Sequence, residues 1–261
     1  MSGMSSVSSS IAILGAGNLG SAIAKRLVEV GYRVYVTGRR KAILDELQNL
    51  GCRVETNPRA VERCDVVIVT VKPNDVLSLL GEIKNSVRGK TLISFAAMVK
   101  LREMKEILED VRIIRAMTNL FAESGNAFTV YYSEGDVSDI ADIFSSLGEA
   151  ERVDEERIVD VMTAFSGSSP AFVAKLISGF VYAGLSCGLS AELSKKATLS
   201  VFRATARHLG REGEDEFIKR VTTPGGTTIQ GLKKMMEYRV EFALIEALEA
   251  AARKSLGGSG K

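Results

Sequence analysis

The chain has 261 residues, of which 46% are hydrophobic and 25% charged, and its formal net charge is +2. This composition is typical of a globular protein, and the near balance of charge argues against nucleic acid or an acidic membrane surface as a partner. Cys52, Cys64 and Cys187 are odd in number and form no CxxC pair. The sequence therefore predicts neither a disulfide framework nor a zinc or other metal site, and it favours a reducing, cytoplasmic compartment.

Short β-rich runs alternate with helical patterns in the first half of the chain. Residues 1–10 contain no charged or apolar segment of a signal peptide, so we expect a disordered leader there. Strands are predicted at 11–14, 33–37, 65–71, 91–95, 111–116 and 127–132, and helices at 18–31 and 136–148. These strands are apolar throughout, as expected of parallel strands covered on both faces. The sequence predicts a doubly wound, Rossmann-type α/β domain over 11–153.

Helical periodicity dominates the second half, and no convincing strand follows residue 153. We therefore expect an all-helical substrate and dimerisation domain over 154–256 and a flexible tail over 257–261. The helix predicted at 170–188 is almost entirely apolar and borderline in length for a membrane span. Because Lys175 lies inside it and many of its residues are small, we expect it to be buried in a core or an oligomer interface, with no membrane partner.

The pattern G-x-G-x-x-G follows the first predicted strand directly and opens a predicted helix. Glycines there allow a tight turn, a close approach of the backbone to a pyrophosphate, and close packing of helix on sheet. N–H groups at the start of the helix would bind the phosphates. We predict a dinucleotide site whose first loop comprises Gly15, Ala16, Gly17, Asn18, Leu19 and Gly20.

The end of the second predicted strand indicates which dinucleotide binds. Sites for NAD usually place an acidic residue there to bind the ribose hydroxyls, whereas this chain continues as Thr37, Gly38, Arg39 and Arg40, with no acid before Asp45. A guanidinium can bind a 2′-phosphate through two hydrogen bonds. A solvated basic turn would show the same residues. The segment favours NADP(H) over NAD(H), with Thr37, Arg39 and Arg40 at the cofactor.

Further cofactor contacts are expected along the carboxyl edge of the sheet, where ligands bind in such folds. The candidates end the predicted strand at 65–71 or lie in loops after neighbouring elements, and they are Val71, Lys72, Pro73, Asn57 and Ala97. Asn119 follows another strand end, near the expected nicotinamide. Its amide would hold the cofactor carboxamide or a water, or would simply cap the local structure.

Six motifs are distributed over nearly the whole chain: GAGNLGSAI, TVKPNDV, SFAAMV, MTNLFAESGNAFT, FSGSSPAF and VTTPGGTTIQGL. In these motifs the chain resembles the pyrroline-5-carboxylate reductases, which make proline by NAD(P)H reduction of a cyclic imine. The resemblance implies the last step of proline biosynthesis and a homodimer through the C-terminal helices, with larger assemblies left open. The family usually has Met-Pro-Asn where this chain has Met117, Thr118 and Asn119.

Reduction of an imine needs hydride on carbon and a proton on nitrogen. A cyclic imine is basic enough to arrive protonated, so the site must supply position and an anchor for the substrate carboxylate rather than a strong acid. The TTPGGTT segment offers glycines and a helix start whose N–H groups favour an anion. The candidate substrate residues are Thr223, Gly225, Gly226, Thr227 and Thr228.

Thr227 or Thr228 would cap that helix or donate a hydroxyl to the ligand. The resemblance implies that Thr228 lies against the imine nitrogen, as the catalytic residue. A plain corner between two helices would use the same proline and glycines, so this alternative stays open.

Two other functions fit parts of the sequence. A β-hydroxyacid dehydrogenase would use Lys175 as its general acid, since a desolvated lysine can have the lowered pKa that acid–base work needs. Gly179 stands where such enzymes carry an asparagine. A non-catalytic NADP-binding sensor would account for the altered segment at 117–119.

Overall fold

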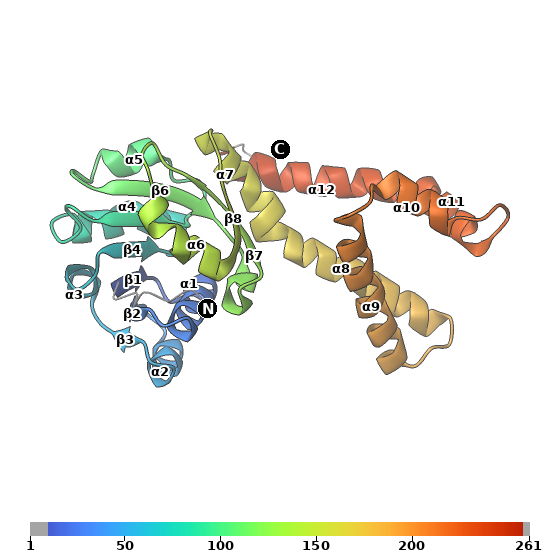
Figure 1. Cartoon of the computed structure of the whole chain (residues 1–261), viewed down its shortest axis with the longest axis horizontal. Helices are drawn as coiled ribbons and strands as arrows, with labels where there is room; N and C mark the ends of the chain where they lie inside the picture. The colour runs from blue at the N-terminus through green and yellow to red at the C-terminus, as the bar shows by residue number, and fades with distance from the viewer. Residues whose placement is uncertain (1–9, 258–261) are drawn as a thin grey trace, which may run out of the picture. The chain divides into compact units, whose positions relative to one another are not determined.

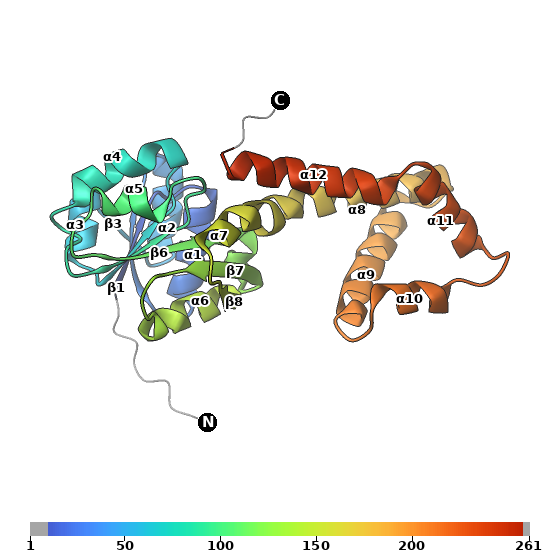
Figure 2. The same cartoon turned by 90° about the horizontal axis from the view of Figure 1, so that it is seen from above.

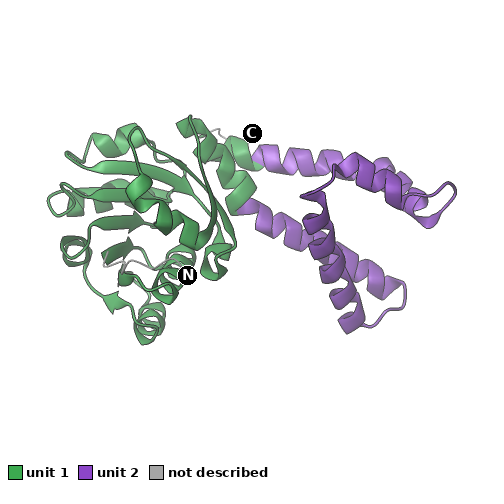
Figure 3. Cartoon of the chain, in the orientation of Figure 1, with its two compact units in different colours: residues 1–167, 251–261 green, residues 168–250 purple. Residues whose placement is uncertain are grey.

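The computed structural model describes residues 10–257, which form two compact units (Figures 1 and 3). Unit 1 comprises the chain up to Gly167 and again from Ala251, and unit 2 comprises residues 168–250. The leader expected at 1–10 lies outside the described residues except for Ser10, which is the first residue of strand β1 and is buried. Of the tail expected at 257–261, only Gly257 is described.

Unit 1 is built on an eight-stranded sheet with the strand order β3-β2-β1-β4-β5-β6-β7-β8. The strands are β1 Ser10–Leu14, β2 Arg33–Thr37, β3 Arg53–Val54, β4 Val66–Val69, β5 Thr91–Ser94, β6 Arg112–Met117, β7 Ala127–Tyr132 and β8 Gly148–Arg152. Neighbouring strands are parallel except that β7 is antiparallel to β6. Strand order reverses between β1 and β4, and in a doubly wound sheet ligands bind beyond the carboxyl ends at such a point.

Helices cover both faces of this sheet. They are α1 Asn18–Glu29, α2 Lys41–Asn49, α3 Asn57–Glu62, α4 Pro73–Ile83, α5 Leu101–Lys105, α6 Ala141–Leu147 and α7 Glu156–Met162, with helical turns η1 Leu120–Ser124, η2 Ser138–Ile140 and η3 Thr163–Ser168. Successive strand residues face opposite ways, so Ile11 and Ile13 pack in one core with α1, α2 and α6, while Ala12 and Leu14 pack in another with α3, α4 and α5. Figure 2 shows α4 and α5 on one face of the sheet and α6 on the other. Burial on both faces explains why these strands are apolar throughout.

Two strands, β3 and β8, are absent from the sequence-based prediction. Both residues of β3 are exposed, and β8 reads GEAER with four exposed positions. Neither has an apolar run. Backbone pairing with Tyr35–Val36 of β2 and with Ala127–Tyr131 of β7 makes them strands, and that pairing depends on tertiary structure.

The boundary between the compact units lies after Gly167, later than the boundary expected after residue 153. The reason is α7, which packs on the sheet: its Val159 shares a small apolar core with Met117 of β6 and Val130 of β7. The first helix after the sheet therefore belongs to unit 1. The six-residue η3, a turn of π-helix, separates it from the helices of unit 2.

A buried ion cluster also ties α7 to the sheet. Arg115 of β6 is fully buried and donates through Nη1 to Glu156 Oε1 (2.8 Å) and through Nη2 to Asp160 Oδ1 (2.8 Å). Lys100 also donates to Asp160. Burial alone would raise the pKa of the Asp160 carboxyl, but the hydrogen bonds from Arg115 and Lys100 outweigh burial and hold that pKa below its ordinary value.

Unit 2 is helical, with α8 Ser169–Ser186, α9 Ala191–Leu209, α10 Glu214–Val221, α11 Thr227–Glu237 and most of α12 Val240–Ser255. Helices α8 and α9 pack closely at Gly184, where an added Cβ would lie 2.1 Å from Ser194 Oγ. Large apolar side chains nevertheless remain exposed, among them Tyr182 (64%) and Val201 (55%). The apolar helix expected to be buried is α8, and within this single chain it has no buried residue. None of the described helices is long and apolar enough to cross a membrane.

Candidate cofactor and substrate sites

A cleft of about 1050 Å³ opens at the carboxyl edge of the sheet, beyond β1, β2 and β4. Most of the predicted cofactor residues line it, and these are Gly15, Ala16, Gly17, Asn18, Thr37, Arg39, Arg40, Asn57, Val71 and Lys72. Gly20 is buried and Leu19 packs against the core behind the loop. Pro73 is the first residue of α4. None of these three residues lines the cleft.

The three glycines of the loop have different steric roles. Gly15 has a φ of +107°, and a Cβ there would lie 2.7 Å from Val71 Cγ1. A Cβ on Gly20 would lie 2.3 Å from the carbonyl oxygen of Gly15, so this glycine lets α1 pack against the loop. A Cβ on Gly17 would meet nothing closer than the same oxygen, at 3.9 Å. The space beside Gly17 is therefore open toward the cleft, as a phosphate site requires.

The start of α1 completes this phosphate-binding loop. Gly17 is the N-cap, and among the described residues no side chain caps the helix and no acidic residue occupies its first turn. N–H groups at such a helix start favour an anion. The loop is held in place because the N–H groups of Gly15 and Ala16 donate to Thr37 O (3.2 and 2.7 Å) and Thr70 Oγ1 donates to Gly15 O (2.8 Å). The arrangement fits a dinucleotide pyrophosphate.

Thr70 lines the cleft but is not among the sequence-predicted residues. Its position immediately after β4 is the feature of the sequence that could have identified it as a cleft residue. The acidic lining residues Glu55, Asp75 and Glu82 were missed as well, because each comes from an element other than β2. Their contacts become visible only when the chain is folded.

The two predicted phosphate-binding arginines lie at the cleft and are both paired. Arg39 Nη2 lies 3.2 Å from Asp75 Oδ2, and Arg40 Nη2 donates to Asn18 Oδ1 (3.3 Å). Asn57, also predicted, donates through Nδ2 to Glu82 Oε2 (2.9 Å). The basic turn after β2 is therefore solvent-exposed, and its two arginines contact α4 and α1.

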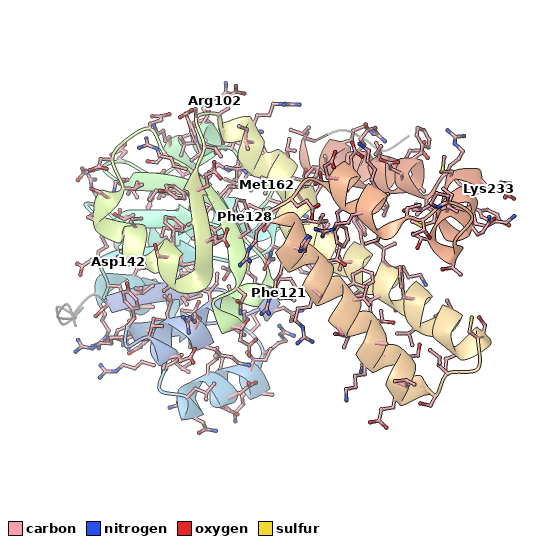
Figure 4. All side chains as sticks on the ribbon, turned by 45° about the vertical axis from the view of Figure 1, so that its right-hand side comes forward. Arg102, Phe121, Phe128, Asp142, Met162 and Lys233 are labelled. Carbon is pink, nitrogen blue, oxygen red and sulfur yellow. The ribbon has the colours of Figure 1, made fainter. Side chains whose placement is uncertain are left out.

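Asn119 and Ala97 do not line the cleft. Asn119 Oδ1 accepts from Phe121 N (3.0 Å), so its side chain caps η1, which is one of the roles predicted for it. Its Nδ2 donates to Ser166 Oγ of η3 (3.2 Å), and that hydroxyl donates to Phe128 O (2.7 Å). Ala97 packs beside the core formed by Met117, Val130 and Val159. The exposed rings of Phe121 and Phe128 lie in this part of unit 1 (Figure 4).

A second hollow, of about 630 Å³, lies at the opposite edge of the sheet, by the amino ends of β5 and β6. Its cations are engaged within the chain. Lys90 Nζ donates to the carbonyls of Val61 (2.8 Å) and Cys64 (2.5 Å), and Arg112 Nη2 donates to Asp139 Oδ2 (2.6 Å). These contacts are structural, and we do not take the hollow as a cofactor site.

The predicted substrate segment forms a β-turn in unit 2. Gly226 N donates to Thr223 O (3.1 Å), Pro224 occupies the second position, and Gly225 has a φ of +71° at the third. These are the residue preferences of a type II turn. The turn leads directly into the first helical residue of α11, Thr227.

Of the two roles expected for Thr227 or Thr228, capping α11 or donating a hydroxyl to the ligand, the structure contradicts the first, and the second stays a prediction. Gly226 is the N-cap, with extended backbone angles, and both threonines lie inside the first turn of α11. Among the described residues no side chain caps α11. Its first N–H groups therefore resemble those of α1 in being available to an anion.

Lys175, the general acid of the alternative dehydrogenase function, is exposed on α8. In the single described chain it therefore lacks the buried surroundings that this alternative function assumes.

Comparisons with known proteins extend over both units. A family model described as pyrroline-5-carboxylate reductase dimerisation matches residues 156–257, and one described as NADP oxidoreductase, coenzyme F420-dependent, matches residues 10–98. The chain is 30% identical to a pyrroline-5-carboxylate reductase of Arabidopsis thaliana and 33% identical to one of Glycine max, in each case over 94% of both chains. It is also similar to a crystal structure of Plasmodium falciparum pyrroline carboxylate reductase with NADP bound, with a TM-score of 0.88, 26% identity, and 96% and 98% of the two chains covered.

Proposed function

Because the chain belongs to the pyrroline-5-carboxylate reductase family, we propose that it reduces 1-pyrroline-5-carboxylate to L-proline with NADPH, the last step of proline biosynthesis. One observation carries the proposal: a cleft with an open glycine loop and two arginines occurs in the same chain as a Pro-Gly-Gly turn that opens α11. Bound NADPH supplies the hydride. The residues of the chain supply the other two requirements of the reaction, which are the positioning of the substrate and the binding of its charged groups.

Each part of the two sites has a role in this proposal. Gly17 and the start of α1 hold the pyrophosphate, and Arg39 and Arg40 hold the 2′-phosphate. The Thr223–Gly226 turn and the first N–H groups of α11 hold the substrate carboxylate. A protonated imine donates its N–H to the hydroxyl oxygen of Thr228, so that Thr228 orients the ring rather than providing the proton.

The test is NADPH oxidation with pyrroline-5-carboxylate, with L-proline identified as the product. Thr228→Ala is expected to lower kcat/KM about 10- to 100-fold, the value of one hydrogen bond to a charged group, and Thr228→Ser should restore most of it. If Thr228→Ala and the double change with Thr227→Ala both leave turnover and substrate affinity intact, the segment is only a corner between helices.

The same assay separates the alternatives. Lys175→Ala should cause only a modest loss, and a near-complete loss would favour a β-hydroxyacid dehydrogenase. Tight NADPH binding without turnover of any imine or keto acid would indicate a sensor.

We also propose a homodimer through the helices of unit 2 and a cytoplasmic location. The exposed apolar side chains of α8 and α9 support the dimer, because a monomer rarely leaves so many large apolar groups in water. The location rests on Cys52, Cys64 and Cys187, all free thiols, as is usual in a reducing compartment.

A further inference from the structure

The end of β2 lacks an acidic residue in the sequence, but the folded chain brings one to it. Asp75 comes 36 residues after Arg39 and lies in the first turn of α4. Its Oδ2 is 3.2 Å from Arg39 Nη2, and both residues line the cofactor cleft. A carboxylate is therefore present where a dinucleotide fold commonly distinguishes a 2′-hydroxyl from a 2′-phosphate.

Among the acidic residues that line the described cleft, Asp75 is the one paired with Arg39. Glu55 Oε1 lies 3.6 Å from Arg63 Nε, and Glu82 accepts from Asn57. Asp75 thus differs from the other two in contacting the basic turn that follows β2. Asp75 is therefore the lining carboxylate that we expect to affect the predicted 2′-phosphate contact most.

The Arg39–Asp75 pair can be exchanged for another partner. The Arg39 side chain is largely exposed (86%) and that of Asp75 is about half exposed (46%), so water weakens their attraction. A phosphate forms charge-assisted hydrogen bonds with a guanidinium and competes with the carboxylate for the same N–H groups. A ribose 2′-hydroxyl carries no charge and can donate a hydrogen bond to a carboxylate.

We propose that Asp75 sets the cofactor specificity of this cleft. Its carboxylate competes with the 2′-phosphate of NADPH for Arg39 and accepts a hydrogen bond from the 2′-hydroxyl of NADH. The chain therefore binds both cofactors, and its preference for NADPH is smaller than Arg39 and Arg40 alone would give. This inference rests on the proposed function only in taking the cleft as the NADP(H) site.

Asp75→Asn tests the inference by calorimetric titration of the full chain with NADPH, NADH and 2′,5′-ADP. We expect NADPH and 2′,5′-ADP to bind about threefold more tightly and NADH about threefold more weakly, a shift of about tenfold in preference, as suits a solvent-exposed contact. Equal changes for NADPH and NADH, or no change, would overturn it.

Two further variants isolate the cause. Glu82→Gln removes a negative charge from the same helix and cleft without touching Arg39, and it should shift the preference between NADPH and NADH much less than Asp75→Asn does. In an Arg39→Ala background, Asp75→Asn should no longer tighten NADPH binding. If Asp75→Asn still tightened NADPH binding in the Arg39→Ala background, Asp75 would not act by competing for Arg39.

These titrations need no turnover, so they distinguish the two proposals. A chain that binds 2′,5′-ADP but reduces no imine would contradict the proposed reaction and leave the role of Asp75 in place. A wild-type chain that does not bind 2′,5′-ADP would overturn the role of Asp75, because the cleft would then have no 2′-phosphate contact.

Discussion

Gly17 and Gly20 lie in one loop, but a methyl group added to each would meet different surroundings. At Gly17 the nearest atom is 3.9 Å away, whereas at Gly20 the carbonyl oxygen of Gly15 is 2.3 Å away. We expect Gly17→Ala to leave the unfolding free energy within about 0.5 kcal/mol of wild type and to weaken NADPH binding about tenfold or more. Gly20→Ala should cost about 1–3 kcal/mol of stability. Urea unfolding and NADPH titration check both; equal destabilisation by the two changes would contradict this account.

The ionisation of Asp160 makes the free energy of unfolding depend on pH in the acid range. The hydrogen bonds from Arg115 and Lys100 depress the pKa of its carboxyl below the ordinary 3.8 in the folded chain. A depressed folded-state pKa contributes stability that is present above the unfolded value and is lost as pH falls from about 4 through the folded pKa. Asp160→Asn should cost about 3–5 kcal/mol near neutral pH by leaving Arg115 with an incomplete partner set, and it should flatten the acid decline. Urea midpoints across acid and neutral pH measure this, and an unchanged profile would exclude Asp160 as the cause.

At the scale of elements, the turn before α11 depends on Gly225, whose φ of +71° a side chain tolerates poorly. Gly225→Ala is expected to cost about 1–2 kcal/mol and to raise the KM for pyrroline-5-carboxylate by moving the start of α11. Gly231 is the matched control. It lies within α11 with nothing within 4 Å of an added Cβ, so Gly231→Ala should stabilise the chain by about 0.5–1 kcal/mol. If Gly225→Ala behaves like this control, the turn does not need glycine.

Elements whose residues show apolar periodicity could be predicted from the sequence, whereas strands that form only by pairing with a neighbouring strand could not. The β1–α1–β2 unit follows from apolar runs and the three loop glycines, because local spacing determines both. β8 has exposed, charged residues and becomes a strand only beside β7. In the cleft, Arg39 could be predicted from its place after β2. Asp75 could not, because its contact with Arg39 depends on how α4 packs against the sheet.

For the whole molecule, the exposed apolar surface of unit 2 predicts association of two chains. We expect a solution mass of twice the chain mass and a Tm that rises with protein concentration. Tyr182→Lys and Val201→Lys place a charge at strongly exposed apolar positions of α8 and α9 and should weaken the dimer. Arg102→Gln, on α5 of unit 1 (Figure 4), is the control and should not change the mass. A wild-type chain that stays monomeric at high concentration would refute the dimer.

Unit 1 contains both ends of the described chain, and this affects how the protein is made. The hydroxyl of Ser255, in the last turn of α12, donates to the carbonyl oxygen of Asp160 in α7 (2.7 Å). On the ribosome the sheet emerges first, and earlier parts of a chain generally begin to fold first. The contact from Ser255 can form only after all of unit 2 has been synthesised. Unit 1, whose translation begins before that of unit 2, is therefore completed only after unit 2 has been translated.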